Sequence, residues 1–115
     1  MSGSIERVED LGSKSCKPHT KGEKPVHIVL VRERLSQLSG WKLSGKRIVK
    51  AFTFKNFYET IAFVNAVAYI ANREDHHPDL EVGYKTCQVS YSSHDIGGLS
   101  LNDFICAAKI DRLSK

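Results

Sequence analysis

The stretch NFYETIAFVNAVAYIANRED, residues 56–75, is the strongest helix signal in this chain of 115 residues. Its apolar residues form two stripes about 120° apart on a helical wheel. One stripe holds Phe57, Ile61, Val64 and Ala68, and the other holds Phe63, Val67 and Ile70. Asn56 followed by Glu59 is typical of a capping box. A helix with two apolar stripes has more to bury than one sheet face covers, so we expect one stripe to meet a sheet and the other a partner subunit.

Two pairs of predicted strands flank this helix. Residues 41–54 are expected to form a hairpin that reverses near Ser44-Gly45. Residues 80–93 are expected to form a second hairpin with a tight reversal near Gly83-Tyr84. In its longer strand the apolar side chains alternate with polar ones, which predicts one buried face made by Cys87, Val89 and Tyr91.

Two further helices are predicted outside the strand pairs. Over residues 26–40, one helical face is made by Ile28, Val31, Leu35 and Leu38, and Gly40 ends the helix. Over residues 100–113, Ser100 is a good N-cap with an acid, Asp103, three positions later. The buried stripe of this last helix is expected to hold Leu101, Phe104, Ile105 and Ala108.

This order of elements predicts an α+β fold. We expect a four-stranded antiparallel sheet with three helices packed on one face, in the order α-β-β-α-β-β-α. A chain of this length accommodates one domain, which we place at residues 26–115. Residues 1–25 are polar, with lysines, glycines and two prolines, and are expected to form an extended N-terminal arm.

Composition excludes several classes of protein. The longest apolar run is far below the roughly 18 residues of a membrane helix, and the N-terminus lacks the apolar core of a signal peptide. Three cysteines without a close pair fit a reducing, cytoplasmic compartment. Residues 1–50 carry 11 basic and 5 acidic side chains, but the basic residues are scattered. Nucleic-acid binding is therefore not expected.

The stretch REDHHPDLEVGYK, residues 73–85, places two histidines side by side. If the second hairpin reverses near Gly83-Tyr84, paired positions sum to about 167. His94 is then carried back toward His76 and His77, because neighbouring strands lie about 4.8 Å apart. The hairpin therefore predicts three imidazoles around one small space.

Three interpretations of these histidines remain open from spacing alone. A three-histidine metal site is one, but adjacent histidines point in different directions, so we expect no metal. Proton transfer is the second, because imidazole titrates near neutral pH and needs no cofactor for this task. The third is a polar helix end, where a protonated histidine interacts favourably with the helix dipole.

Residues 74–104 resemble the pterin-4a-carbinolamine dehydratase family. The motifs that carry the resemblance are His76-His77-Pro78, Tyr84, His94 and GLSLNDF. Upstream, LSGWKL and FTFKNFYETIAFVNAVA extend it, so that it covers roughly residues 28–112. Family membership implies a hydro-lyase that dehydrates 4a-hydroxytetrahydropterin to quinonoid dihydropterin without a metal or redox cofactor. That reaction recycles the pterin cofactor of aromatic amino acid hydroxylases such as phenylalanine hydroxylase, which implies a functional link to that enzyme.

The resemblance also implies roles for individual residues. His76, His77 and His94 would line the pterin pocket, with His76 and His94 transferring protons and His77 orienting the ring. The residues that would flank the pocket and bind the pterin are Asp75, Ser92, Ser93, Asp95 and Asp103. Family members often carry an acid four residues before the first histidine, where this chain has Asn72.

The family forms homodimers and homotetramers with the long helix at an interface, in agreement with the two stripes described above. An alternative of another class is a protein-interaction module, of the dimerisation or transcriptional cofactor type, that uses the apolar face of helix 57–70. The intact set of three histidines argues against this alternative.

Overall fold

The computed structural model describes residues 8–114 of the chain. Its helices and strands follow the predicted order, with one additional helix at the start. The elements are α1 (Val8–Ser13), α2 (Ile28–Ser36), β1 (Lys42–Ser44), β2 (Arg47–Thr53), α3 (Phe57–Glu74), β3 (Asp79–Val82), β4 (Thr86–Tyr91), the 3-10 turn η1 (His94–Ile96), α4 (Leu101–Asp111) and the 3-10 turn η2 (Arg112–Ser114).

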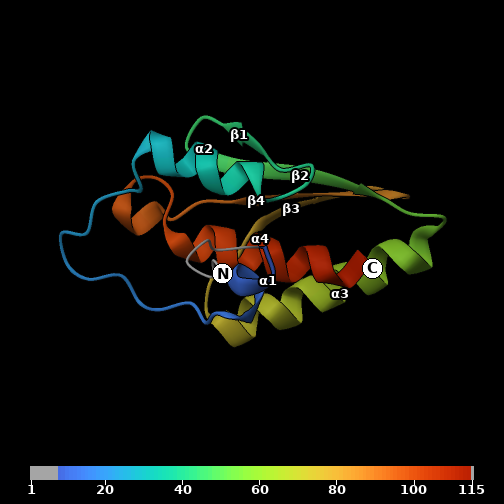
Figure 1. Cartoon of the computed structure of the whole chain (residues 1–115). Coiled ribbons are helices and arrows are strands. Elements are labelled where there is room, and N and C mark those ends of the chain that lie inside the picture. Colours follow the sequence, from blue (N-terminus) through green and yellow to red (C-terminus); the bar gives the residue numbers. More distant parts are fainter. Residues whose placement is uncertain (1–7, 115) are drawn as a thin grey trace.

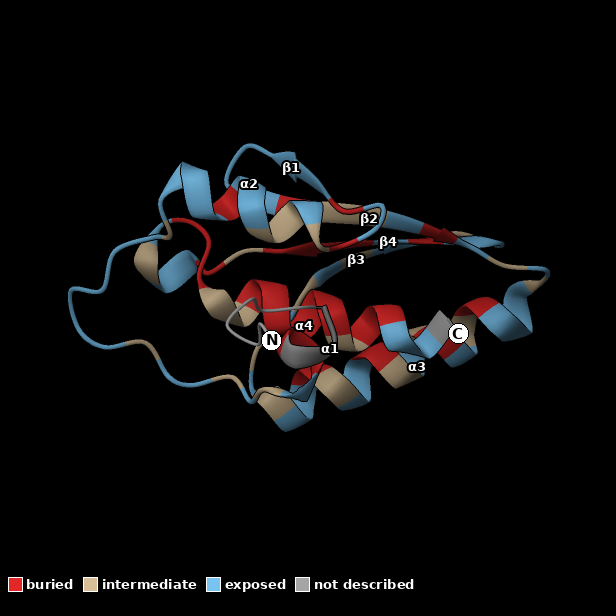
Figure 2. Ribbon diagram, in the orientation of Figure 1, coloured by how far each residue is buried: buried red, intermediate tan, exposed pale blue. Residues whose placement is uncertain are grey.

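The strands form one antiparallel sheet in the order β1-β2-β4-β3, which confirms the predicted α+β class. Figure 1 shows α1, α3 and α4 together on one side of this sheet. The strand residues that face these helices are buried, as Figure 2 shows for β2 and β4. They include Ile48, Phe52, Cys87, Val89 and Tyr91. The predicted alternation in the fourth strand is therefore correct.

Helix α3 begins and packs as its sequence indicates. The Asn56 side chain accepts a hydrogen bond from the Glu59 backbone N–H at 2.9 Å. Phe63 and Val67 of one predicted stripe are buried, and Thr60 and Ala71 extend that stripe. In the other stripe Val64 is half-buried against the core, whereas Phe57, which is 45% exposed, and Ala68 lie at the surface. The second stripe is thus covered only in part by the described residues.

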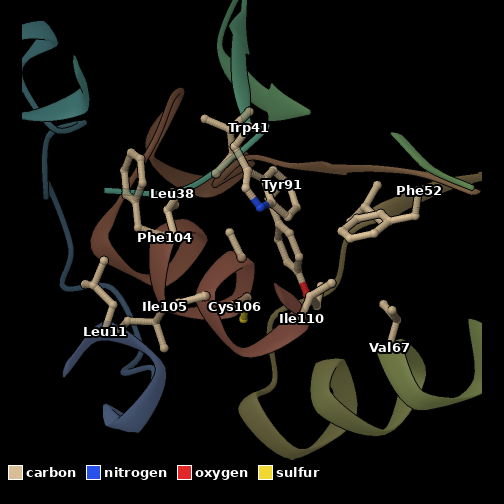
Figure 3. Packing of buried hydrophobic residues seen from close by; sticks show 14 of the residues in the cluster. Leu11, Leu38, Trp41, Phe52, Val67, Tyr91, Phe104, Ile105, Cys106 and Ile110 are labelled. Atoms are coloured by element: carbon tan, nitrogen blue, oxygen red, sulfur yellow. The ribbon is translucent and has the colours of Figure 1, made fainter. Parts of the chain in front are cut away.

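The N-terminal arm departs from the prediction over residues 8–13, which form α1 instead of an extended segment. Leu11 of this helix is fully buried. Figure 3 shows it facing Ile105 of α4. The Lys109 ammonium also donates a hydrogen bond to the Gly12 carbonyl at 2.8 Å. Val8 and Leu11 stand three positions apart in an otherwise polar stretch, which is too short a pattern to predict a helix, so the tertiary packing reveals this element.

The second hairpin reverses one residue later than predicted. Asp79 pairs with Ser90 and Leu80 with Val89, and the Gly83 N–H donates to the Thr86 carbonyl at 2.8 Å. This places the turn centre at Tyr84-Lys85. Because the register differs by two positions, the same side chains face the core as predicted.

The predicted helix over residues 26–40 is shorter than expected. It begins at Ile28, with His27 as the N-cap, and ends at Ser36. No helix within residues 8–114 is long and apolar enough to cross a membrane.

Candidate active site

His76 lies where α3 ends, and a local backbone feature directs it inward. Asp75 adopts a left-handed conformation with φ of 52°, which aspartate tolerates better than most residues. The His76 N–H then closes back onto the Ala71 carbonyl at 3.1 Å. Pro78 follows within two residues and cannot continue a helix. The chain therefore turns sharply after α3 and brings the His76 ring back against the sheet.

Two contacts hold the His76 imidazole, and a third holds its backbone. Its Nε2 donates a hydrogen bond to Asp103 Oδ1 at 2.6 Å. Its ring stacks on the Tyr91 ring with centroids 5.2 Å apart and an interplanar angle of 17°. The Tyr91 hydroxyl in turn donates to the His76 carbonyl at 3.2 Å. Because the His76 side chain is only 12% exposed, these contacts leave the ring one orientation.

Asp103 is the acidic partner that α4 supplies. Its carboxylate is fully buried, and Oδ2 accepts hydrogen bonds from the Ser93 hydroxyl and the Ser100 N–H, both at 2.9 Å. It also lies in the first turn of α4, where a negative charge is favourable. Three donors in a buried setting make this a pre-organised partner for a protonated imidazole.

Two opposing effects set the pKa of His76. Burial alone would lower it, but the hydrogen bond and the charge of Asp103 together with the charges of Cys106 and Asp95 outweigh burial and raise the pKa above the usual value. The imidazolium is therefore present at higher pH than in a solvated histidine. A group in this state is suited to deliver a proton near neutral pH.

The other two predicted histidines lie at the surface and have separate partners. His77 is exposed, and its Nε2 donates to Asn72 Oδ1 at 3.0 Å. His94 begins η1, is exposed, and lies 3.4 Å from the Ser92 hydroxyl. Asn72, which replaces the acid of the family pattern, is thus the partner of the second histidine and not of His76.

Residues 16–19, called the N-terminal segment below, contribute to the site although the sequence analysis did not assign them to it. The Cys16 N–H donates to Glu74 Oε1 at 2.8 Å, and the Lys17 N–H donates to Asn102 Oδ1 at 3.1 Å. His19 lies with its ring centroid 6.5 Å from that of His76. The signal in the sequence was the C-x-x-H spacing of Cys16 and His19, which by itself is weak evidence for a metal site.

The two cysteines beneath this segment interact directly. The Sγ atoms of Cys16 and Cys106 lie 3.6 Å apart. The hydrogen bond from Cys16 lowers the pKa of the Cys106 thiol, and the same bond raises the pKa of Cys16. Within residues 8–114, no group of three histidine, cysteine or acidic side chains is arranged to hold a metal ion.

A polar pocket of about 560 Å³ opens beside His76. It lies between the end of α3, η1, the start of α4 and the N-terminal segment. Its walls include His19, Arg73, Glu74, Asp75, His76 and Asp95. This volume falls in the range of sites for small organic ligands, roughly 300–1,000 Å³. Of the predicted binding residues, Asp75 and Asp95 line the pocket, whereas Ser93 and Asp103 lie behind it in the hydrogen-bond network of His76.

Comparisons with known proteins agree on one family. The family model described as Pterin 4 alpha carbinolamine dehydratase matches residues 25–113. A protein of Nitrosospira multiformis, provisionally named a pterin-4-alpha-carbinolamine dehydratase, is 57% identical over 106 residues, 92% of this chain and 94% of its own. A protein of Nitrosomonas europaea with the same provisional name is 52% identical over 112 residues, 96% of this chain and 99% of its own.

Two solved structures share the fold. The transcriptional coactivator/pterin dehydratase of Brucella melitensis is 26% identical, with a TM-score of 0.76, and the match covers 80% of this chain and all of that one, 100%. A pterin dehydratase-like protein identified as a RuBisCO assembly factor in the alpha-carboxysome has a TM-score of 0.57 and 24% identity, covering 65% of this chain and 89% of that one. The second likeness shows the fold alone.

Proposed function

The chain belongs to the pterin 4 alpha carbinolamine dehydratase family, and from this premise we propose that it dehydrates 4a-hydroxytetrahydropterin to quinonoid dihydropterin by histidine acid–base catalysis. The observation that carries the proposal is the buried pair of His76 and Asp103 at the wall of the 560 Å³ pocket. A charged imidazole beside a pocket for a small ring system supplies the proton that the leaving hydroxyl needs.

In the proposed reaction His76 is the general acid. Its imidazolium gives a proton to the 4a-hydroxyl oxygen, the C4a–O bond breaks, and water leaves. A ring nitrogen of the pterin loses its proton to a base, and the electron pair of that N–H bond forms the new double bond. We assign the base to His94. The two transfers balance, so the reaction consumes no net proton and needs no redox partner.

The remaining predicted residues bind the pterin in this proposal. His77 orients the ring, and its bond to Asn72 fixes which nitrogen carries its proton. The carboxylates of Asp75 and Asp95 line the pocket and can accept hydrogen bonds from the amino and amide N–H groups of the pterin. Ser92 orients His94 through the contact between its hydroxyl and the imidazole. Ser93 and Asp103 act through His76.

A dehydration assay with matched variants tests the proposal. We expect His76→Ala and His94→Ala each to lose about 10²–10⁴-fold in kcat, the usual contribution of a positioned acid or base. The control is His27→Asn, since His27 caps α2 away from the pocket and asparagine preserves the cap. Full activity in both alanine variants would overturn the assignment of acid and base. A chelator should leave the rate unchanged.

We further propose that the protein works in the cytoplasm as a homo-oligomer and recycles the cofactor of an aromatic amino acid hydroxylase. The exposed part of the second α3 stripe supports self-association, because Phe57 and Ala68 present apolar surface beside a well-packed core. Ala68 lies on this stripe and is exposed, so Ala68→Arg should shift the species observed by light scattering toward the monomer. An unchanged mass would show that α3 does not lie in the interface between subunits. The interaction-module alternative is not favoured.

A further inference from the structure

A continuous chain of hydrogen bonds links His76 to a second histidine that the proposed reaction does not use. It starts at the 2.6 Å bond between His76 and Asp103. Asp103 Oδ2 accepts from Ser93 Oγ at 2.9 Å, and Ser93 Oγ lies 2.8 Å from Ser100 Oγ. Ser100 Oγ lies 2.9 Å from His19 Nε2, and His19 Nδ1 lies 2.6 Å from Asp95 Oδ2. The chain thus runs from the buried acid to an exposed carboxylate.

The middle of this chain is shielded from water. Ser93 is 1% exposed, Ser100 is 2% exposed and Asp103 is fully buried. Even the His19 side chain, which comes from the N-terminal segment, is only 10% exposed. Hydrogen bonds in such a setting are electrostatically stronger and polarise one another. A change at His19 is therefore transmitted to Asp103 with little screening.

When His19 is protonated, the hydroxyl hydrogens of both serines in the chain point toward Asp103. The imidazolium donates from Nδ1 to Asp95 and from Nε2 to the Ser100 oxygen. The Ser100 hydroxyl is then free to donate to Ser93, and the Ser93 hydroxyl donates to Asp103. Asp103 then receives its full set of donors.

When His19 is neutral with its proton on Nδ1, the same chain loses one of its bonds, because the Ser100 hydroxyl has a single hydrogen to donate. With its proton on Nδ1 facing Asp95, Nε2 becomes an acceptor for the Ser100 hydroxyl, and Asn102 Nδ2 at 3.2 Å can donate to it as well. Ser100 then no longer donates to Ser93. The Ser93 hydroxyl must choose between Ser100 and Asp103, so either the link between the two serines or a bond to Asp103 is lost.

We propose that His19 is a positioning residue of the site, which acts on His76 through Ser100, Ser93 and Asp103 and keeps the Asp103 carboxylate aligned with the His76 imidazole. This inference rests on the proposed function only in that His76 is the group whose protonation matters. It makes the N-terminal segment part of the catalytic apparatus, although no catalytic step passes through it.

Several other groups face the two imidazoles and stay constant in the test. Asp103 and Cys106 of α4, Asp95 of η1 and the ring of Tyr91 from β4 face His76. Asp95, Ser100 and Asn102 face His19, and Lys17, Arg73 and Glu74 complete the charged wall of the shared pocket. The variants below leave all of these charges in place. Loss of a positive charge at His19 would by itself move the His76 midpoint to higher pH, because like charges repel, so a shift to lower pH reports on the hydrogen-bond chain.

The test is an NMR titration of the His76 imidazole in wild type, His19→Gln and the control His27→Asn. Glutamine keeps a polar group near Ser100 but cannot carry charge. We expect the His76 midpoint to move to lower pH in His19→Gln and to stay in place in His27→Asn. In the dehydration assay, kcat of His19→Gln should fall about two- to tenfold, the change that one net hydrogen bond corresponds to.

A second variant separates transmission through the chain from a loss of the pocket wall. Ser93→Ala interrupts the chain in its middle, so His19→Gln should add nothing further to the His76 midpoint in that background. An unchanged midpoint in His19→Gln, or additive shifts in the double variant, would overturn the inference. The titration needs no turnover, so an inactive wild type would refute the proposed dehydratase function and leave this inference to be decided separately.

Discussion

Replacing Asp103 by asparagine should weaken catalysis and stability through different bonds of one side chain. The amide is nearly isosteric with the carboxylate, so it preserves packing at a fully buried position. Its oxygen can still accept from His76 Nε2. Its amino group, however, replaces an acceptor that now serves the Ser93 hydroxyl and the Ser100 N–H. The hydroxyl can rotate to accept, whereas the backbone N–H cannot.

The structure gives a magnitude for both losses. An unsatisfied buried donor costs about 1–3 kcal/mol, so the free energy of unfolding should fall by about that amount. A hydrogen bond to a charged partner contributes about 1.5–3 kcal/mol, which corresponds to roughly 10- to 150-fold in kcat if His76 must be charged to act. Asp79→Asn is the matched control, because the Asp79 side chain is 73% exposed and its ion pair with Arg47 spans 4.0 Å.

The pH dependence has a definite sign. The folded pKa of His76 is raised above its unfolded value, so its contribution to stability is complete below the unfolded pKa and is lost as pH rises through the folded pKa. Asp103→Asn removes the cause of the raised pKa. The alkaline limb of the kcat profile should therefore move to lower pH, and the stability difference from wild type should be larger at acidic than at alkaline pH.

Urea unfolding on both sides of neutrality and a pH series of the dehydration assay measure these effects. A kcat within twofold of wild type together with an unmoved alkaline limb would refute the assignment of His76 as an acid held by Asp103. A large loss of stability with unchanged kinetics would show that the carboxylate serves the fold alone.

Three further predictions concern groups outside this pair. Asp111→Ala removes the acceptor of Trp41 Nε1 at 3.0 Å and of the Lys50 ammonium at 2.9 Å, so the free energy of unfolding should fall by about 2–4 kcal/mol in a urea titration, while Asp111→Asn should retain part of it. Leu11→Ala empties a fully buried site between α1 and α4 and should cost about 2–4 kcal/mol; a cost below about 0.5 kcal/mol would mean that α1 does not pack in solution. A low-molecular-weight disulfide in excess should oxidise Cys16 and Cys106 to one disulfide, because their sulfurs lie 3.6 Å apart; both hydrogens and both electrons pass to the reagent. Burial raises the pKa of Cys87 and should keep it a thiol, so peptide mapping that finds Cys87 in the bridge would contradict this prediction.

The fold was predictable where local periodicity and burial agree. Alternation made Cys87, Val89 and Tyr91 a buried face, and the Asn56–Glu59 spacing marked the start of α3. The turn of the second hairpin was predicted one residue too early, because glycine is common in tight turns and Gly83 was therefore placed at its centre. The actual pairing is set by the backbone hydrogen bonds between β3 and β4. The apolar pattern around Leu11 is too short to predict a helix. Helix α1 is stabilised by the packing of Leu11 against α4.

The residue types of the candidate site were predictable from the sequence, but the hydrogen bonds between these residues were not. The adjacent histidines and Asp103 were identified as site residues, but nothing in the spacing showed that Asp103 binds His76 while His77 turns to Asn72. His19 lies 57 positions before His76 and belongs to a polar segment with no regular pattern. Side chains brought together by tertiary structure leave no local signal, so such partners are visible only in three dimensions.

The attachment of the N-terminal segment has a consequence for the order of folding. Its bonds to α4 join residues 81 to 90 positions apart, as between His19 and Ser100 or Cys16 and Cys106. Closing such loops costs entropy that is repaid only after both ends are positioned. On a ribosome, the His76 pocket therefore cannot close until α4, the last long helix, has emerged. In the finished protein, we expect these few contacts to open without global unfolding, so the backbone amides of Cys16, Lys17 and His19 should exchange with solvent well before those of β4.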